Sequence, residues 1–370
     1  MPRNFATLSA SWGLSMNVSR MSSQLGEWLR GSGPESDVVV STRIRLARNL
    51  AREPFTTRAT PHQKAEIESR LREVVGLLEL EQPLTYVSVA AMPAIDRQFL
   101  VERQLISREL AGVLDGPRGV AFDEPETVSL MVNEEDHLRL QSMRSGLELE
   151  AAWATIDKVD DAIESRVEYA FTDEFGYLTA CPTNVGTGMR ASVMLHLPAL
   201  GLAKQIDKAF KALQKINLVV RGLYGEGSRA LGDFFQISNQ ITLGKSEVAS
   251  LNDIRAVILE IIKYERMARS TLMREARQNI LDKVARALGT LQSATMMTSE
   301  ETMELLSAVR LGVHLKLVGD LSPLTVNELF IHTQPAHLQK LIGEPLDGEA
   351  RNSARASYLR NRLRMAGSSS

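Results

Sequence analysis

The chain has 370 residues, of which 44% are hydrophobic and 24% are charged, and its formal net charge is -2. This near-neutral balance argues against a protein that binds nucleic acid through an overall positive charge. A single cysteine, Cys181, excludes an intramolecular disulfide and favours a reducing, cytoplasmic environment. No apolar run reaches the roughly 20 residues of a membrane-spanning helix, so we expect no membrane among its partners.

The N-terminal region combines an irregular extension with a first strand and helix. Residues 1–20 are Ser-rich and lack the ordered features of a secretion signal, so we expect a disordered extension. A strand is predicted over residues 38–46, where arginines alternate with apolar residues. Thr60 and Pro61 suit the N-cap and first position of a helix that we expect to end near residue 80.

Strand and helix patterns alternate along the first two thirds of the chain. Because few two-residue hairpin signals occur and long helices separate the strands, we predict an α+β fold. Its sheet should be mixed, mostly antiparallel and flanked by helices. The predicted strands cover residues 128–132, 177–180, 192–197, 218–221 and 234–241, and an amphipathic helix is predicted over residues 149–171.

The pattern changes near residue 268. Helical periodicity over residues 280–291, 301–317, 326–331, 335–342 and 349–363 predicts an all-α domain. We therefore divide the chain into an extension at 1–20, a first domain at 21–267, a helical domain at 268–366 and a flexible tail at 367–370.

Five arginines stand beside glycines, carboxylates and short strands instead of on amphipathic helices. Guanidinium groups stay charged and bind phosphate in a bidentate manner, so these arginines could converge on one polyanion. Each could alternatively be a surface charge or half of a structural ion pair. The P-loop pattern fails because Asn239 occupies its first glycine position, so any nucleotide must be held otherwise. The five residues are Arg43, Arg45, Arg139, Arg190 and Arg221.

An acidic segment, Glu134-Glu135-Asp136, follows the strand predicted over residues 128–132. Adjacent carboxylates there would suit a metal, a general base or a bound cation, and an ordinary acidic turn is the alternative. His332 and His337 are five residues apart, which does not place them on one helical face, so we predict no metal site.

Three segments closely resemble the signature sequences of the phosphagen kinases, which are ATP:guanido phosphotransferases. They are residues 41–48, 132–139 and 181–192, and their order and spacing agree with the family as well. Residues 221–227, 235–244 and 333–340 look like the bacterial protein arginine kinases of that family. The resemblance covers residues 25–364. It implies a phosphagen-kinase-like catalytic domain that uses ATP and Mg²⁺.

By this resemblance, the five arginines bind the ATP phosphates, and Glu135 and Glu226 hold the guanidinium of the substrate. Free guanidinium has a pKa of about 12.5–13.8 and is a poor nucleophile, so one carboxylate must take its proton. We expect Glu135 to be this base and Glu226 the clamp. Cys181 would lie beside the guanidinium as a thiolate, and an inert buried thiol is the alternative. Gln104 stands where related kinases tend to have a histidine near the adenine.

The C-terminal helix offers a second site. Family members often carry an Arg-Asp-x-x-Arg-Ala motif there that binds phosphoarginine, and this chain has Arg351, Asn352 and Arg355. Arg351 and Arg355 share a helical face and could grip a phosphate. An amide cannot pair ionically with a guanidinium, so we expect a weakened or lost allosteric pocket. A solvated basic helix is the alternative.

The resemblance implies a protein arginine kinase that marks proteins for Clp-type degradation and regulates a stress response. It also implies a homodimer formed through the C-terminal domain. A zinc-binding activator protein, a heat-shock repressor and a Clp unfoldase are the implied partners. The alternatives are a kinase of a small guanidino metabolite and a non-catalytic regulator that binds phosphoarginine or nucleic acid.

Overall fold

The structure is a computed structural model that describes residues 20–112, 115–206, 210, 217–222, 231–319 and 321–367. Nearly all of the expected extension at 1–20 and of the expected tail at 367–370 lies outside these residues. Within the described ranges, no helix is long and apolar enough to cross a lipid bilayer.

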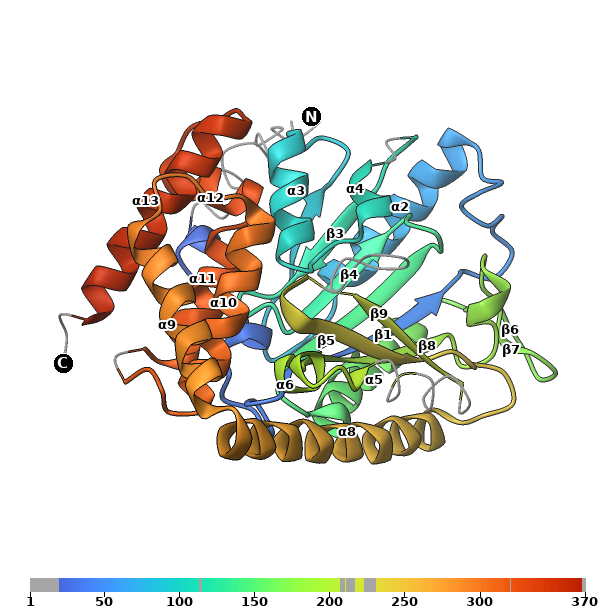
Figure 1. The fold of residues 1–370 in the computed structure, drawn as a ribbon. Helices are drawn as coiled ribbons and strands as arrows, with labels where there is room; N and C mark the ends of the chain where they lie inside the picture. Colours follow the sequence, from blue (N-terminus) through green and yellow to red (C-terminus); the bar gives the residue numbers. More distant parts are fainter. Residues whose placement is uncertain are drawn as a thin grey trace.

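One eight-stranded sheet forms the centre of the molecule, in the order β2-β3-β4-β5-β1-β8-β10-β9 (Figure 1). Every pair of neighbouring strands is antiparallel, so the parallel pairing that a mixed sheet would contain is absent from the described strands. The strands are β1 (Val39–Arg48), β2 (Thr85–Ser88), β3 (Gly119–Phe122), β4 (Val128–Val132), β5 (Leu138–Ser145), β8 (Met189–His196), β9 (Leu218–Gly222) and β10 (Phe234–Asn239), with β6 (Phe171–Thr172) and β7 (Gly176–Tyr177) as a separate hairpin.

The predicted strand over residues 177–180 is wrong. Strand β7 ends at Tyr177; beyond it, the backbone N–H of Leu178 donates to Ala170 O at 2.8 Å and that of Ala180 donates to Asp136 Oδ1 at 2.7 Å. The strands expected over residues 38–46, 128–132, 192–197, 218–221 and 234–241 are present as β1, β4, β8, β9 and β10.

Several helices begin at a Ser or Thr whose side chain caps them, namely Thr60, Ser246, Thr298 and Ser322. Thr60 accepts from the backbone of Gln63, whose side chain accepts in return from Thr60, so a capping box starts α2 as predicted. Helix α5 ends at Glu164 instead of residue 171. The residues after it pair with the segment that follows β1, because Ala51 N–H donates to Glu168 O and Ala170 N–H donates to Asn49 O. The helices are α2 (Pro61–Gly76), α3 (Ala94–Glu102), α4 (Arg108–Gly112), α5 (Leu149–Glu164), α6 (Pro198–Leu202), α8 (Glu247–Glu275), α9 (Arg277–Ser293), α10 (Ser299–His314), α11 (Pro323–His332), α12 (Pro335–Ile342) and α13 (Gly348–Gly367), with short 3₁₀ turns η1 (Glu27–Leu29), η2 (Pro182–Asn184) and η3 (Leu231–Asp233).

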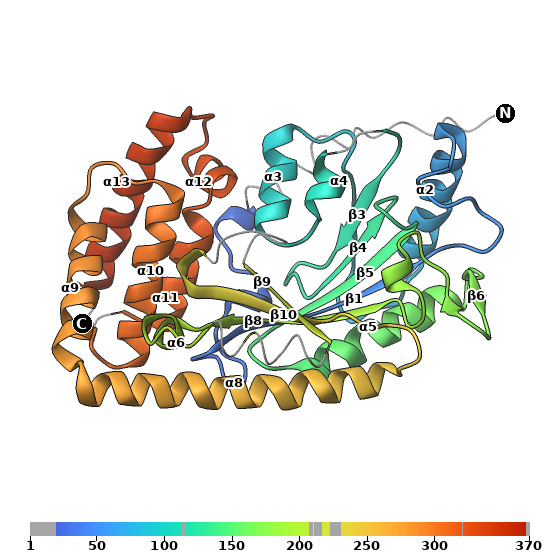
Figure 2. The same ribbon diagram turned by 45° about the vertical axis from the view of Figure 1, so that its right-hand side comes forward.

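The two faces of the sheet are covered differently. Helices α2, α5 and α8 pack their apolar residues against one face, which includes Ile44 and Leu46 of β1. On the other face, α3 and α4 lie over β2 to β4, and the C-terminal helices lie over one end of the central strands. Figure 2 shows this division, with the orange and red C-terminal helices beside α3.

The C-terminal helices α9 to α13 form the predicted all-α region. They do not have a core of their own, because Met194 and Phe234 of the sheet share one buried cluster with Met303 and Phe330 of the helices. Helix α8 runs along the base of the molecule below both regions and passes through the predicted boundary at 267/268 (Figure 2). The division into domains therefore stays a prediction.

Candidate active site

The antiparallel register brings the predicted arginines of β1, β5, β8 and β9 onto one face of the sheet. Side chains alternate across a strand, so Arg43 and Arg45 point away from the core that holds Ile44 and Leu46. Arg45 lies directly opposite Arg190 on β8. Arg139 lies opposite Ala47 of β1, and Arg221 lies opposite Gln236 of β10.

This face carries an excess of positive charge. Burial, together with the neighbouring Arg139 and Arg190, lowers the pKa of Arg43 to about 9, and Glu134 offsets part of this effect. Burial and the surrounding arginines hold the pKa of Arg45 well below its usual value. The Nε of Arg45 is buried with no hydrogen-bond partner among the described residues. An unused hydrogen-bond donor and an excess of positive charge together favour the binding of a polyanionic ligand such as a triphosphate.

Two glutamines hold Arg43 in place. Arg43 Nε donates to Gln141 Oε1 at 2.6 Å, and its Nη1 donates to Gln104 Oε1 at 3.1 Å. Gln141 Nε2 donates in turn to the backbone oxygen of Gln104 at 2.7 Å. Gln104 therefore orients a predicted phosphate-binding arginine through its amide. Gln141 was not predicted, although it lies on the same face of β5 as Arg139.

The acidic segment is an ordered loop between β4 and β5. Asp136 Oδ1 accepts from Asn49 Nδ2 at 2.7 Å, and the backbone N–H of His137 donates to Asn49 Oδ1 at 2.9 Å. His137 Nδ1 accepts from the backbone N–H of Leu50 at 3.0 Å. Asp136 Oδ1 and the two ring nitrogens of His137 thus fix the loop, while Asp136 Oδ2 is buried without a hydrogen-bond partner among the described residues.

The two glutamates of this loop have different surroundings. Glu134 is buried and accepts from Arg139 Nη1 at 2.7 Å. Burial alone would raise the pKa of Glu134, but Arg139 and a hydrogen bond from Ser107 outweigh it and lower the pKa. Glu135 is 41% exposed and lies 3.5 Å from Arg139 Nη2. Partial burial and the nearby Asp136 and Glu134 raise the pKa of Glu135, which makes it the better proton acceptor.

Cys181 lies on a loop tied to the acidic segment. The bond from Ala180 N–H to Asp136 Oδ1 fixes the residue before it, and Cys181 Sγ lies 3.0 Å from Thr183 Oγ1. Gly186 ends this loop at a φ of +114°, where an added Cβ would lie 2.2 Å from a backbone oxygen. Only glycine therefore fits there. Glu226 lies outside the described residues.

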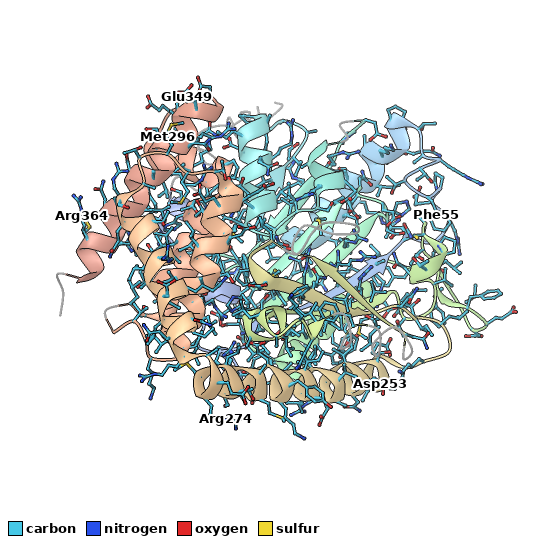
Figure 3. The ribbon with its side chains drawn as sticks, viewed as in Figure 1. Phe55, Asp253, Arg274, Met296, Glu349 and Arg364 are labelled. Atoms are coloured by element: carbon cyan, nitrogen blue, oxygen red, sulfur yellow. The ribbon has the colours of Figure 1, made fainter. Side chains whose placement is uncertain are left out.

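The predicted phosphoarginine residues lie on α13. Arg355 is buried and donates from Nε to Thr333 O and from Nη1 to Met297 O and Asn352 Oδ1, all within 2.9 Å. Burial and the nearby Arg351 lower the pKa of Arg355 to about 10. Arg364 is exposed at the outer surface of the molecule, as Figure 3 shows. The three predicted residues are therefore partly or fully buried and do not belong to a solvated basic face.

A cavity of about 650 Å³ lies over the arginine-bearing face. The sheet lines it with Arg43, Arg45 and Arg221, α3 and α4 close one side, and α10 and α11 close another. In the described part of the chain, no three His, Cys, Asp or Glu side chains are grouped so that they could hold a metal ion.

Two family models match the chain. The model described as ATP:guanido phosphotransferase, C-terminal catalytic domain, matches residues 66–268. The model described as protein-arginine kinase McsB C-terminal domain matches residues 277–370. Together they cover strands β2 to β10 and the C-terminal helices, and β1 lies before both matches.

Similar proteins include a protein-arginine kinase of Halothermothrix orenii, which is 44% identical over 341 residues, 92% of this chain and 97% of that protein. One from Symbiobacterium thermophilum is 46% identical over 350 residues, 94% of this chain and 98% of that protein. Among solved structures, a lombricine kinase aligns with a TM-score of 0.58 and 28% identity, over 68% of this chain and 71% of that one. A taurocyamine kinase of Schistosoma mansoni with bound transition-state analogue components aligns with a TM-score of 0.58 and 29% identity, over 66% of this chain and 35% of that one.

Proposed function

This chain belongs to the protein-arginine kinases of the ATP:guanido phosphotransferase family, and from that premise we propose how its residues transfer the γ-phosphoryl group of ATP to arginine side chains of proteins. The observation that carries the proposal is the set of under-neutralised arginines on one sheet face, with Glu135 at its edge.

Arg43, Arg45, Arg139, Arg190 and Arg221 bind the phosphates. Phosphoryl transfer depends on alignment and on charge neutralisation, because charge spreads over the oxygens of the transferring group. The arginines are fixed by strand pairing before the ligand arrives, so little reorganisation is needed. The free Nε of Arg45 supports a direct role in binding a phosphate oxygen.

Glu135 acts as the general base. A nitrogen of the substrate guanidinium attacks the γ-phosphorus, the bond to the β–γ bridging oxygen breaks, and ADP leaves. The proton that the nitrogen loses goes to Glu135. Its raised pKa supports this role, since a stronger base accepts the proton more readily. Family resemblance supports Glu226 as a second carboxylate that orients the guanidinium, and Cys181 as a thiolate beside it.

Mg²⁺ fits the site as part of the bound nucleotide. Mg²⁺ usually keeps several waters and is held by substrate phosphates and one or two carboxylates, not by an all-protein cage. The described donors agree with that mode, because Glu134 and Glu135 lie near the arginine face without a third acidic or histidine ligand. The ion would neutralise phosphate charge when bound.

Family resemblance supports further proposals that concern the cell. They are a cytoplasmic location, a homodimer formed through the C-terminal helices, and a role in Clp-type degradation and stress response. The same resemblance supports a zinc-binding activator, a heat-shock repressor and a Clp unfoldase as partners. It also supports a phosphoarginine pocket at Arg351, Asn352 and Arg355, weakened by the amide.

The test is phosphoryl transfer from labelled ATP to casein, with free arginine as a parallel acceptor. We expect acid-labile label on casein, because an N–P bond breaks in acid. Glu135→Gln should reduce the rate about 10²- to 10⁴-fold. Glu150→Gln is the matched control, since Glu150 is exposed and paired with Arg255. Label on free arginine alone would contradict protein substrates, and full activity in Glu135→Gln would remove Glu135 from the site.

A further inference from the structure

The cavity changes character along its length. On the strands β5 and β8, which flank β1, the residues of the cavity face run from charged or polar to apolar in the same direction. On β8 they are Arg190, Ser192 and Met194, and on β5 they are Arg139, Gln141 and Met143. Since alternate residues lie roughly 7 Å apart, the apolar end begins within a nucleoside's length of the arginines.

The C-terminal helices build the wall of the apolar end. Met303 of α10 and Phe330 of α11 line the cavity together with Met194 and Phe234 of the sheet and Trp28 of η1. All five belong to the buried cluster that joins the helices to the sheet. Gln334 Nε2 donates to the backbone oxygen of Phe330 at 2.9 Å and lies 3.4 Å from Met303 Sδ, so these side chains are held in place.

We propose that the C-terminal helices complete the pocket for the nucleoside of ATP, with Met303 and Phe330 as the wall that the base contacts. This inference rests on the proposed function, because it takes the triphosphate to bind at the arginines. The base is then directed toward the apolar end of the same cavity. Thioether and aromatic groups are suited to a flat heterocycle, which gains both apolar burial and sulfur–aromatic contact.

A consequence is that the nucleotide contacts both regions of the molecule at once. The base touches the cluster that packs α10 and α11 onto the sheet, so bound ATP should stabilise that packing. A ligand that has the phosphates and no base should not. The proposal therefore separates ATP from inorganic tripolyphosphate, which can occupy only the arginine end.

The experiment measures the dissociation constants of ATP and of inorganic tripolyphosphate by calorimetry, on the full chain with Mg²⁺. The readout is the ratio of the tripolyphosphate constant to the ATP constant. We expect Met303→Ala to lower this ratio about tenfold, because the contact with the base is lost. Phe330→Leu is a second variant that nearly conserves core volume and should lower the ratio in the same direction.

Met296→Ala is the matched control. Met296 is 49% exposed, lies just before α10 and does not line the cavity (Figure 3). The ratio of the two dissociation constants measured for Met296→Ala should therefore equal that of the wild type. An unchanged ratio in both Met303→Ala and Phe330→Leu would overturn the inference, whatever the absolute affinities. The proposed function fails separately, if Arg45→Met leaves the affinity for both ligands unchanged.

Discussion

Buried arginines occur in two regions of this molecule and are treated differently in each. On the sheet face, Arg45 keeps a buried Nε without a partner among the described residues. In the C-terminal helices, Arg310 donates to the backbone oxygens of Ser36 and Asp37 and to His196 Nδ1. Burial lowers the pKa to about 9 in both regions, for Arg43 and for Arg310.

The comparison shows that burial and a lowered pKa do not identify a binding arginine. Arg310 is buried because it ties α10 to the loop before β1, and its carbonyl acceptors need a donor. Arg45 is held among like charges by strand pairing. The Nε of Arg310 likewise has no partner among the described residues, so what separates the two is that Arg310 donates from both of its Nη nitrogens within the protein.

The largest expected effect is on catalysis. Arg45→Met should lower kcat/KM for ATP about 10²- to 10³-fold, because one preorganised donor to the transferring group is lost. Without nucleotide, the free energy of unfolding should stay constant or rise, since Arg43 and Arg190 lose a like-charged neighbour. Steady-state kinetics measure the change in kcat/KM, and urea unfolding measures the change in the free energy of unfolding. A marked loss of stability would make Arg45 a structural residue like Arg310.

Arg310→Met is the reverse case. We expect the free energy of unfolding to fall by about 3 kcal/mol, because two backbone oxygens and a histidine nitrogen lose their donor in a buried site. Urea unfolding measures it. Arg286→Met, at an exposed ion pair with Asp282, is the matched control and should change stability by less than about 1 kcal/mol. Equal stability of the two variants would remove the contrast.

Much of the arginine site was readable from the sequence. The alternation in β1 and the three signature segments predicted Arg43, Arg45, Arg139 and Arg190, and the segment at 221–227 predicted Arg221; their placement on one face agrees with this prediction. The strand register that sets Arg45 opposite Arg190 was not readable, because it joins residues far apart in the chain. Gln141 and Gln104 gave no signal either, since neutral amides act here only through their contact with Arg43.

The C-terminal region was predicted as helical but not as part of the cavity. Helical periodicity tells which face of α10 is apolar, not what it packs against. Helix α10 packs over Phe234 and Met194, a contact that depends on the tertiary structure and not on the local sequence. Helix α8 was missed for a related reason, since its exposed face carries Leu259, Tyr264 and Met267 and so blurs the apolar stripe.

The contact between α3 and α12 joins the two regions and should respond to pH. Burial lowers the pKa of His337 to about 2, so the folded protein keeps it neutral while the unfolded chain is protonated below about 6.5. Stability is therefore lost as the pH falls below that value, by about 2 kcal/mol at pH 5. Burial raises the pKa of Glu102 to about 7, and this group acts in the opposite direction.

Variants separate these two contributions in urea unfolding at pH 7.5 and pH 5. His337→Gln keeps a donor for the Ser22 carbonyl and should lose less stability on acidification than the wild type. Glu102→Gln should lose more, because the carboxylate no longer gains a proton on the folded side. Identical pH profiles in all three proteins would contradict the role of this contact.

A smaller effect is expected at Gln104. Gln104→Ala removes the oxygen that receives Arg43 Nη1, while Gln141 still holds Nε. We expect KM for ATP to rise about fivefold, or about 1 kcal/mol, with a smaller change in kcat. Gln278→Ala, at an exposed position of α9, serves as the control. A fall in kcat with unchanged KM would mean that Gln104 acts on the transition state alone.

The smallest effect tests whether a satisfied arginine can still bind a ligand. Arg355 uses Nε and Nη1 within the protein, and its Nη2 donates to none of the described residues. We expect Asn352→Asp to raise the affinity for phosphoarginine about threefold, because a carboxylate pairs with the guanidinium of the ligand where an amide cannot. Calorimetry with free phosphoarginine measures it, and Asn352→Ala is the control. Equal affinity in all three proteins would mean that Arg355 serves only the fold, as Arg310 does, and that one unused donor is not enough to make a binding site.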